Sequence, residues 1–435
     1  MDKVRKLQRR LFKAAKRNQG RRFHALYDRI YRGDVLMEAW ERVRANRGGS
    51  GVDGETLSAI ESRGVEEFLR ELLDELRSGR YRPRPVRREY LSKPDGGQRP
   101  LGIPAVRDRV VQAAAKIVLE PIFEADFEEC SFGFRPRRSA TDAKEAIRLT
   151  GGRGHYWVVD ADIRAFFDSI DQDLLLERLG RRISDRRVLK LVRQWLRAGV
   201  MEEGRWRKST TGTPQGGVIS PLLANIYLDA LDEAWQREWR HLGRLVRYAD
   251  DFVVLCRTRR QAEEALARLR EILETLRLEL HPHKTRLVEL GLGKESFCFL
   301  GCTFRVVRSH FSAKRYLYRW PSPRAMKSLR ARIRALTDRR RRAGMRDIRE
   351  VIEDLNPLLR GWGNYFRTGN ASQKFRQIDR YVAERLVRLL VSRRHRNWKR
   401  RPFRLREWPH SRFVEEHGLY KLLGTIRYPG AAHAT

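Results

Sequence analysis

Residues 247–255 read RYADDFVVL and place two adjacent carboxylates, Asp250 and Asp251, between two apolar runs. The apolar runs predict two short strands joined by a tight turn. Adjacent acids are costly if they are merely buried there, because like charges repel and desolvation disfavours the ionised form. One interpretation is a solvated hairpin tip, since Asp is common in turns. The other is a divalent-cation site, which needs a third carboxylate from elsewhere in the chain.

A second acidic stretch lies in YWVVDADIRAFFDSI, whose first half, Tyr156–Ile163, predicts a strand. Asp160 and Asp162 alternate onto one face of this strand, and we expect the apolar residues around them to be buried. An acid that closes an apolar strand and precedes two aromatic residues resembles the first catalytic motif of nucleic-acid polymerases. Three carboxylates can hold two Mg²⁺ ions about 3.5–4 Å apart for in-line phosphoryl displacement. Mg²⁺ suits such a site because it prefers hard oxygen ligands.

The charge balance of the chain predicts a polyanionic partner. The 435 residues contain 93 Lys and Arg against 55 Asp and Glu, a formal net charge of +38. Such a surplus favours nucleic acid, bound largely through phosphates in a salt-sensitive way. An anionic membrane surface is the alternative, but no apolar run approaches the length of a membrane span. The basic N-terminus lacks the apolar core of a secretory signal, so we expect a soluble, cytoplasmic protein.

The order of predicted elements favours an α+β fold. Residues 1–80 are predicted to be mainly helical, and YRPRPVRREYLSKPDGGQRPLGIP predicts a β-hairpin with its turn at Pro94–Gly97. The next segment, RDRVVQAAAKIVLEPIFEADF, predicts a helix that closes at Pro121. Beyond Pro323 the chain is helical again and more basic. Helices mixed with hairpins, rather than a βαβ repeat, indicate a mostly antiparallel sheet.

The four cysteines give no disulfide framework for a chain of this length. They are Cys130, Cys256, Cys298 and Cys302. Cys298 and Cys302 have no second close cysteine pair that would complete a zinc site. Ordinary core cysteines are therefore the favoured interpretation.

Seven blocks of the sequence occur in an order that indicates a family. They are RPLGIPAVRDRVVQ, SFGFRPRRSATDA, VVDADIRAFFDSID, GTPQGGVISPLLANIYLD, RYADDFVVL, LHPHKT and FLGCTF. Together they resemble the reverse transcriptase/maturase proteins that bacterial group II introns encode, over about residues 85–304. GWGNYFR at 361–367 and the basic helix after it resemble the maturase-specific domain, which extends the likeness to most of the chain.

This resemblance implies a right-hand polymerase, with fingers and palm around an antiparallel sheet, followed by an α-helical thumb/maturase domain. The expected parts are an N-terminal helical extension with the start of the fingers (1–84), the fingers/palm (85–322), the thumb/maturase-specific domain (323–396) and a basic C-terminal tail (397–435). Many relatives continue into an HNH endonuclease with paired CxxC motifs. This sequence has no such cysteine pairs, so we expect no second-strand cleavage.

The resemblance also implies the catalytic residues. Asp162, Asp250 and Asp251 are the expected catalytic acids, and Asp160 is the rival of Asp162. The expected metal-ligand set is Asp162, Ile163, Asp250 and Asp251, holding two Mg²⁺ ions for which Mn²⁺ can substitute. One ion would lower the pKa of a primer 3′-OH, and the other would bind the departing pyrophosphate.

Six positions match the nucleotide-binding residues of the family. They are Lys93 and Arg99 for the triphosphate, Phe167 for exclusion of a ribose 2′-OH, Gln215 and Gly216 for the incoming nucleotide, and Lys284 for pyrophosphate departure. Plainer interpretations are surface charges for the first pair, a simple turn for TPQGG, and an exposed helix-end lysine for Lys284. Phe166 is expected in the core.

The densest basic run, residues 388–406, carries nine Lys or Arg. A run this basic is hard to explain as a solvated face, so we expect a stripe that binds structured RNA. The expected RNA-binding residues are Arg388, Arg393, Arg394, Arg396, Lys399, Arg400 and Arg401. For the aromatic residues of GWGNYFR we favour packing in the core over stacking on bases.

The implied function is RNA-templated DNA synthesis coupled to splicing and mobility of a group II intron. The expected partners are the intron RNA, an RNA template with a DNA primer, dNTPs, and target DNA on the nucleoid. One alternative is a related reverse transcriptase recruited to defence or repair. Another is an RNA-binding splicing cofactor with little polymerase activity, against which the intact acids and Gln215 argue.

Overall fold

The structure is a computed structural model that describes residues 2–92, 97–202, 205–207, 212, 216–308, 314–338, 347–394 and 408–428. The chain clusters into two compact units that interleave along the sequence. Unit 1 comprises Met1–Ser139, Val159–Val254 and Arg259–Arg286, and unit 2 comprises Ala140–Val158, Leu255–Thr258 and Leu287–Thr435. The domain boundaries expected after residues 84, 322 and 396 stay predictions.

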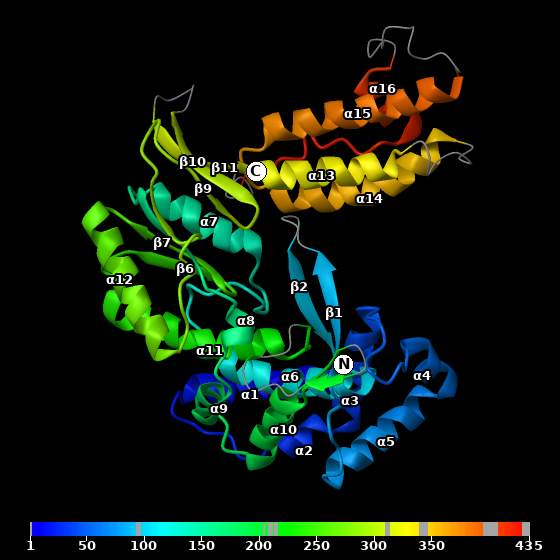
Figure 1. The fold of residues 1–435 in the computed structure, drawn as a ribbon, viewed down its shortest axis with the longest axis vertical. Coiled ribbons are helices and arrows are strands. Elements are labelled where there is room, and N and C mark those ends of the chain that lie inside the picture. The colour runs from blue at the N-terminus through cyan, green and yellow to red at the C-terminus, as the bar shows by residue number, and fades with distance from the viewer. Residues whose placement is uncertain are drawn as a thin grey trace. The chain divides into compact units, whose positions relative to one another are not determined.

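Helix α6 (Val106–Glu124) is buried along most of its length, and the N-terminal helices α1, α2 and α3 contact it (Figure 1). Both α1 and α3 pack against α6. On α1, the buried residues Val4, Leu7 and Leu11 recur at helical spacing, which explains why this very basic segment forms an amphipathic helix. The helices are α1 (Asp2–Arg17), α2 (Tyr27–Ile30), α3 (Gly33–Ala45), α4 (Leu57–Arg63) and α5 (Val65–Arg77). The helical character predicted for residues 1–80 is confirmed.

Helix α6 passes through Pro121 and ends only at Glu124, so the prediction that it closes at Pro121 is wrong. Proline has no N–H to donate to the carbonyl four residues before it, which normally breaks a helix. In this helix the freed carbonyl of Ile117 accepts a hydrogen bond of 3.1 Å from Nε2 of Gln8 on α1. A side chain more than a hundred positions away thus replaces the missing backbone donor.

The predicted hairpin forms from β1 (Val86–Ser92) and β2 (Gln98–Ile103). The two strands are antiparallel, with a register that runs from Arg87 opposite Ile103 to Ser92 opposite Gln98. Two short strands, β4 (Val200–Glu202) and β5 (Arg205–Arg207), complete a sheet in the order β2-β1-β4-β5.

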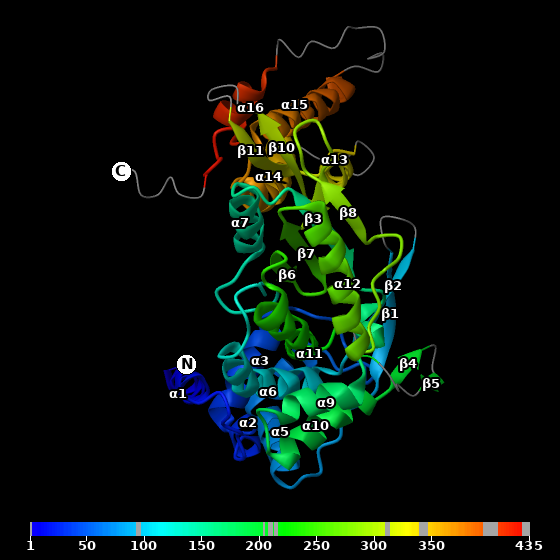
Figure 2. The ribbon, with the colours of Figure 1, turned by 90° about the vertical axis from the view of Figure 1, so that its left-hand side faces the viewer.

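The RYADDFVVL stretch lies in a second four-stranded sheet, in the order β6-β7-β3-β8 (Figure 2). Its strands are β6 (Arg244–Tyr248), β7 (Asp251–Cys256), β3 (Trp157–Asp162) and β8 (Arg286–Glu289). Only Ala249 and Asp250 connect β6 to β7, and a connection this short joins antiparallel strands. The hairpin predicted for this stretch is confirmed.

Five helices complete unit 1, and α11 contacts α6, α9 and α12. They are α8 (Phe166–Ser169), α9 (Gln172–Gly180), α10 (Arg186–Arg197), α11 (Ser220–Ala234) and α12 (Arg259–Thr275). Helix α11 continues into a π-helical turn, η1 (Trp235–Trp239). The long helix predicted from Pro221 therefore exists but changes its winding near its end.

Unit 2 combines α7 with a three-stranded antiparallel sheet, in the order β11-β10-β9, and with a group of helices. Helix α7 packs on β11, and α15 contacts α13, α14 and α16. The elements are α7 (Ala140–Gly151), β9 (Phe297–Phe299), β10 (Cys302–Arg308), β11 (Arg315–Pro321), α13 (Pro323–Leu336), α14 (Ile348–Phe366), α15 (Ser372–Arg394) and α16 (His410–His417). The helical region predicted beyond Pro323 is confirmed.

These elements confirm a mixed fold of helices and antiparallel sheets. Three cysteines are buried, as core residues should be, but Cys298 is exposed. Within the described ranges, none of the helices is long and apolar enough to cross a membrane.

Candidate active site

The sheet brings four acids to one region. Asp250 lies in the turn after β6, Asp251 begins β7, and Asp160 and Asp162 lie in the last part of the neighbouring strand β3. All four are only partly exposed. The carboxyl of Asp251 feels the negative charge of the other three. The sheet therefore brings acids of β3 to the Asp250–Asp251 turn, and the ligand role of a third carboxylate stays a prediction.

Two of these acids are engaged by cations. Lys284 Nζ lies 2.5 Å from Oδ2 of Asp162, and Arg286 Nε lies 3.1 Å from Oδ2 of Asp160. As the side chains stand, no three His, Cys, Asp or Glu residues in the described part of the chain form a group that could hold a metal ion. Asp162 would have to leave Lys284 to join Asp250 and Asp251. Because the Lys284 side chain is 61% exposed, that ion pair is weak and easily exchanged.

Burial and charge repulsion together raise the pKa values of the acids in the turn. Burial, reinforced by Asp160, Asp250 and Asp162, raises the pKa of Asp251 to about 7. Burial raises the pKa of Asp250 too, and the charge of Arg99 opposes the shift. Carboxylates that repel one another in this way are the hard oxygen ligands that Mg²⁺ prefers. The donor chemistry fits a divalent cation.

A segment that follows α12 holds the end of β3. The N–H of His281 donates to the carbonyl of Asp162 at 2.7 Å, and the N–H of Arg164 donates to the carbonyl of Glu279 at 2.9 Å. Ile163 and Leu280 form an antiparallel bridge. This pairing places Lys284, three residues after His281, beside Asp162. The sequence marked Lys284 as a candidate but showed no sign of its partner.

The two aromatic residues after β3 have different surroundings. Phe166 is 2% exposed, which confirms its expected place in the core, whereas Phe167 is half-buried. Their rings meet edge to face, with centroids 5.2 Å apart. Phe167 therefore keeps a free surface, which a residue that contacts the sugar of a nucleotide requires.

Two glycines of the GTPQGG stretch, Gly212 and Gly216, lie close to other backbone segments. A side chain at Gly212 would lie 2.7 Å from the carbonyl of Phe167, and one at Gly216 would lie 2.6 Å from the carbonyl of Gly102. Both residues have positive φ angles. The buried side chain of Gln112 on α6 accepts from the N–H of Val218 at 2.9 Å and fixes the end of the loop. Gln112 was missed by the sequence reasoning because its partner lies 106 positions away.

Of the other predicted nucleotide-binding residues, Lys93 and Gln215 lie outside the described residues. Arg99 lies on β2, and its charge reaches Asp250. Gly216 lies against β2, as described above. The structure therefore brings Arg99 and Lys284 to positions where their charges act on the acids, and places Gly216 beside the strand that carries Arg99.

The predicted RNA-binding run begins on α15. Arg388 is exposed on this helix, and Arg393 and Arg394 are its last two residues. Four predicted members lie outside the described residues, namely Arg396, Lys399, Arg400 and Arg401. The proposed RNA contacts of this run stay predictions.

A second basic surface was missed from the sequence. A groove of about 420 Å³, which we call the α13–α15 groove, is lined by residues of α13, α15 and the end of β11. Its four cations are Lys327, Arg330, Arg334 and Lys374. They come from two helices, so no single run in the sequence displays them together. The signal available was the spacing of three of them along one face of α13.

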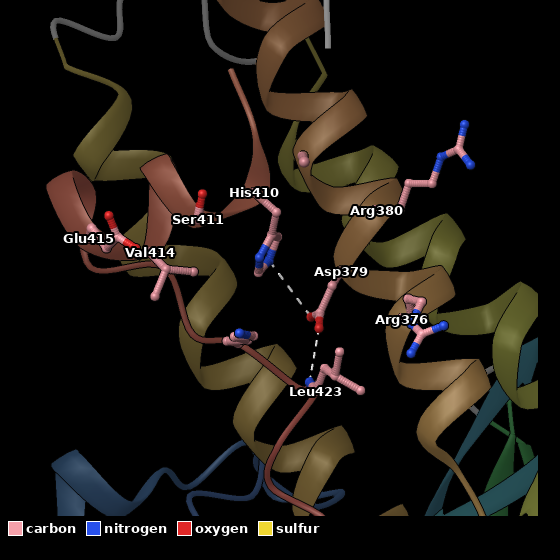
Figure 3. A pocket seen from close by; sticks show the side chains of 10 residues that line it. Arg376, Asp379, Arg380, His410, Ser411, Val414, Glu415 and Leu423 are labelled. Carbon is pink, nitrogen blue, oxygen red and sulfur yellow. Dashed lines mark hydrogen bonds and ion pairs between the residues drawn. The ribbon is translucent and has the colours of Figure 1, made fainter. Parts of the chain in front are cut away.

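The pocket between α15 and α16 has a polar centre that serves the fold (Figure 3). It has a volume of about 360 Å³. Asp379 accepts hydrogen bonds from the N–H groups of Leu422 and Leu423 at 3.0 and 2.9 Å and lies 3.7 Å from His410. Burial lowers the pKa of His410, against the opposing charge of Asp379. These contacts fasten the segment around residue 422 to α15.

The aromatic residues of GWGNYFR pack as expected. The rings of Trp362 and Phe366 are 4.8 Å apart, and Trp362 also lies 5.5 Å from Phe375 of α15. Tyr365 is 38% exposed, with the Lys144 ammonium 3.8 Å from its ring centroid. The motif therefore joins α14 to α15 and α7 within unit 2.

Two family models match the chain. One, described as reverse transcriptase (RNA-dependent DNA polymerase), matches residues 91–304, and the other, the group II intron maturase-specific domain, matches residues 326–408. The first match covers the acid-bearing sheet and the TPQGG stretch. The two matches show a reverse transcriptase, an RNA-directed DNA polymerase, followed by a maturase-specific domain.

Curated relatives narrow the class. Protein YkfC of Escherichia coli (strain K12) is 35% identical over 365 residues, covering 74% of this chain and 93% of that protein. The group II intron-encoded protein LtrA of Lactococcus lactis subsp. cremoris is 38% identical over 227 residues, covering 52% of this chain and 37% of LtrA. The chain belongs to the family of group II intron-encoded reverse transcriptase/maturase proteins.

Among solved structures, a partial Cas6-RT-Cas1–Cas2 complex matches with a TM-score of 0.34 and 24% identity, covering 57% of this chain and 42% of that chain. A TM-score this low carries no argument about this chain.

Proposed function

We propose that this chain extends a DNA primer on an RNA template by two-metal nucleotidyl transfer at Asp162, Asp250 and Asp251. The observation that carries the proposal is the meeting of the Asp250–Asp251 turn with the end of β3, where burial, reinforced by the charges of the neighbouring acids, raises the pKa of Asp251 to about 7. When bound, two Mg²⁺ ions would activate the primer 3′-OH and stabilise the departing pyrophosphate. Mn²⁺ is the expected substitute because it accepts the same oxygen ligands.

Asp162 is the better candidate than Asp160 for the third acid. Asp160 is paired with Arg286, and its side chain is only 16% exposed. Asp162 closes the strand, is more exposed, and is paired with an exposed lysine. We assign Ile163, the residue after it, to the same ligand set. Asp160 then adds negative charge near Asp251 without contacting the metal.

The remaining residues of the region would bind the nucleotide. Arg99 suits the triphosphate because its charge already acts on Asp250, and Lys93 would join it from the hairpin turn. Phe167 would lie under the sugar, with Gln215 and Gly216 against the incoming nucleotide. Once the metal displaces it from Asp162, Lys284 would be free to meet the departing pyrophosphate.

The family likeness supports a right-hand polymerase arrangement of these parts. In this assignment the fingers and palm extend from residue 85 to 322, after the helical extension of residues 1–84. The thumb/maturase domain covers residues 323–396, and the tail follows. The α13–α15 groove supports a thumb that holds the primer–template duplex, because its four cations suit phosphates.

Structured group II intron RNA is the proposed partner of the maturase-specific part. Support comes from the domain match at residues 326–408 and from the net charge of +38. Arg388 and the six further cations of its run are the proposed contacts. Splicing assistance and intron mobility into target DNA follow as roles, performed in the bacterial cytoplasm and on the nucleoid.

The polymerase is tested by addition of one deoxynucleotide to a DNA primer on an RNA template. Asp162→Asn removes charge without changing shape, so the rate should fall by orders of magnitude. Asp160→Asn is the matched control, two residues away on the same strand, and should retain most of the rate. If the two variants exchange these outcomes, the ligand is Asp160. If both keep the wild-type rate, the mechanism is refuted.

A further inference from the structure

Arg247, the first residue of RYADDFVVL, is fully buried beside the catalytic turn. A buried guanidinium is costly unless all its donors are satisfied. Nε donates to Asp232 Oδ1 at 2.8 Å, and Nη2 donates to Asp232 Oδ2 and to Ser131 Oγ. Nη1 donates to Asn225 Oδ1 at 3.1 Å and to the carbonyl of Ala249 at 2.9 Å. All five N–H groups are used, so the guanidinium has one fixed orientation.

Ala249 is the link between this network and the acids. It lies in the turn next to Asp250 and has a φ angle of 58°. Residues that carry a side chain rarely adopt this left-handed conformation. Its carbonyl accepts the hydrogen bond from Arg247. The buried charge of Arg247 therefore holds Ala249, and the direction of the two acids depends on the conformation of Ala249.

The opposite side of the turn is held by residues 130–133. The N–H of Arg247 donates to the carbonyl of Cys130 at 2.8 Å, and the N–H of Phe132 donates to the carbonyl of Arg247 at 2.9 Å. Asn225 Nδ2 donates to the carbonyl of Gly133 at 2.8 Å. A side chain at Gly133 would come within 2.3 Å of the N atom of Ala249. Asn225 thus supports both Arg247 and the glycine that packs against the turn.

A merely structural role does not account for this arrangement. A buried ion pair is weak evidence for stability, because an apolar pair of similar volume often does as well. An apolar pair, however, would provide no donor for the carbonyl of Ala249. What the hydrogen-bond network of Arg247 adds beyond stability is a fixed conformation of the turn.

We propose that Arg247 is a positioning residue that holds Ala249 in its left-handed conformation and thereby aims Asp250 and Asp251 at the metal. It touches neither substrate nor metal. This inference rests on the proposed role of the two acids. Loss of a residue that orients metal ligands typically costs about 10–100-fold in metal affinity or activity, and we expect a loss in that range.

The test measures metal binding as well as activity. Mn²⁺ binding to the full chain is followed by electron paramagnetic resonance, and the Mg²⁺ concentration for half-maximal primer extension is determined in parallel. Arg247→Lys keeps the charge but cannot span all five acceptors, so both midpoints should rise about tenfold or more. The KM for the primer–template should change little. Arg182→Lys is the matched control, because buried Arg182 pairs with Asp126 and touches no residue of the turn.

Two further variants keep the outcome decisive. Asn225→Ala leaves the Arg247–Asp232 ion pair in place, so it should fold even if Arg247→Lys does not, and it should raise the same midpoints. Wild-type midpoints in Asn225→Ala, or in folded Arg247→Lys, overturn the inference. Asp250→Asn in the same assay distinguishes failure of the positioning role from failure of the proposed function. If it abolishes extension while the network variants are normal, only the positioning role fails; if it retains extension, the proposed function fails as well.

Discussion

Asp160 and Asp162 lie two residues apart on one strand yet contact different cations. Arg286, the partner of Asp160, begins strand β8 beside β3, whereas Lys284, the partner of Asp162, lies two residues earlier in the turn that starts at His281. The two acids therefore differ in their partner and in their exposure, which is 16% for the Asp160 side chain and 27% for that of Asp162. Asp162 faces the more exposed cation, and this difference separates a metal ligand from a background charge.

Phe167 carries the prediction about sugar choice. Phe167→Ala should open space beneath the 2′ carbon of the nucleotide and raise the incorporation of ribonucleotides relative to deoxyribonucleotides. Competition between the two substrates at a single template position measures the ratio. Phe167→Tyr keeps the ring and should keep the wild-type ratio. An unaltered ratio in the Ala variant would place the selection at another residue.

At the scale of elements, the sequence predicted what depends on local pattern. The β1–β2 hairpin, the hairpin around Asp250 and the strand ending at Asp162 follow from alternation and turn residues. It did not predict partners that lie far away in the chain, such as Gln8 for Ile117 or Asp232 and Ser131 for Arg247. These contacts exist only after the elements have packed, and no local pattern records them.

Helix α6 provides a test of this long-range compensation. Gln8→Ala should leave the buried carbonyl of Ile117 without a donor and cost about 1 kcal/mol of local stability. Pro121→Ala restores the backbone donor, so Gln8→Ala should cost far less in that background. Native-state hydrogen exchange of the α6 amides measures both effects. Equal costs in the two backgrounds would show that the Gln8 hydrogen bond does not replace the missing donor.

At the scale of the whole molecule, part of the excess of positive charge lies in the α13–α15 groove of unit 2. The cations of the α13–α15 groove are separate in sequence from the run at 388–406. Composition alone predicted nucleic acid as a partner, whereas the groove required the helices to be packed. In the proposed function, the groove would bind the primer–template and the basic run would bind the structured RNA.

The basic run predicts a specific salt dependence. Each phosphate contact should steepen the dependence of affinity on salt by about 0.7–0.9 log units per log unit of salt. Replacing Arg393, Arg394, Lys399 and Arg400 with Gln should therefore weaken binding to structured intron RNA and flatten the slope. The matched control replaces exposed Arg237, Arg240, Arg259 and Arg260 with Gln, removing the same charge elsewhere. If both variants have the same slope, the run is not the RNA surface.

The central claim, that Asp250 and Asp251 and the end of β3 form a polymerase site, is tested most directly by the rate of the first nucleotide addition in a single turnover. The enzyme is saturated with RNA template and DNA primer and then mixed with dNTP and Mg²⁺. Asp251→Asn, which is neutral and similar in shape, should bind the primer–template with wild-type affinity and add the nucleotide at least about a thousandfold more slowly. An Asp251→Asn rate within tenfold of wild type, with binding intact, would contradict the account.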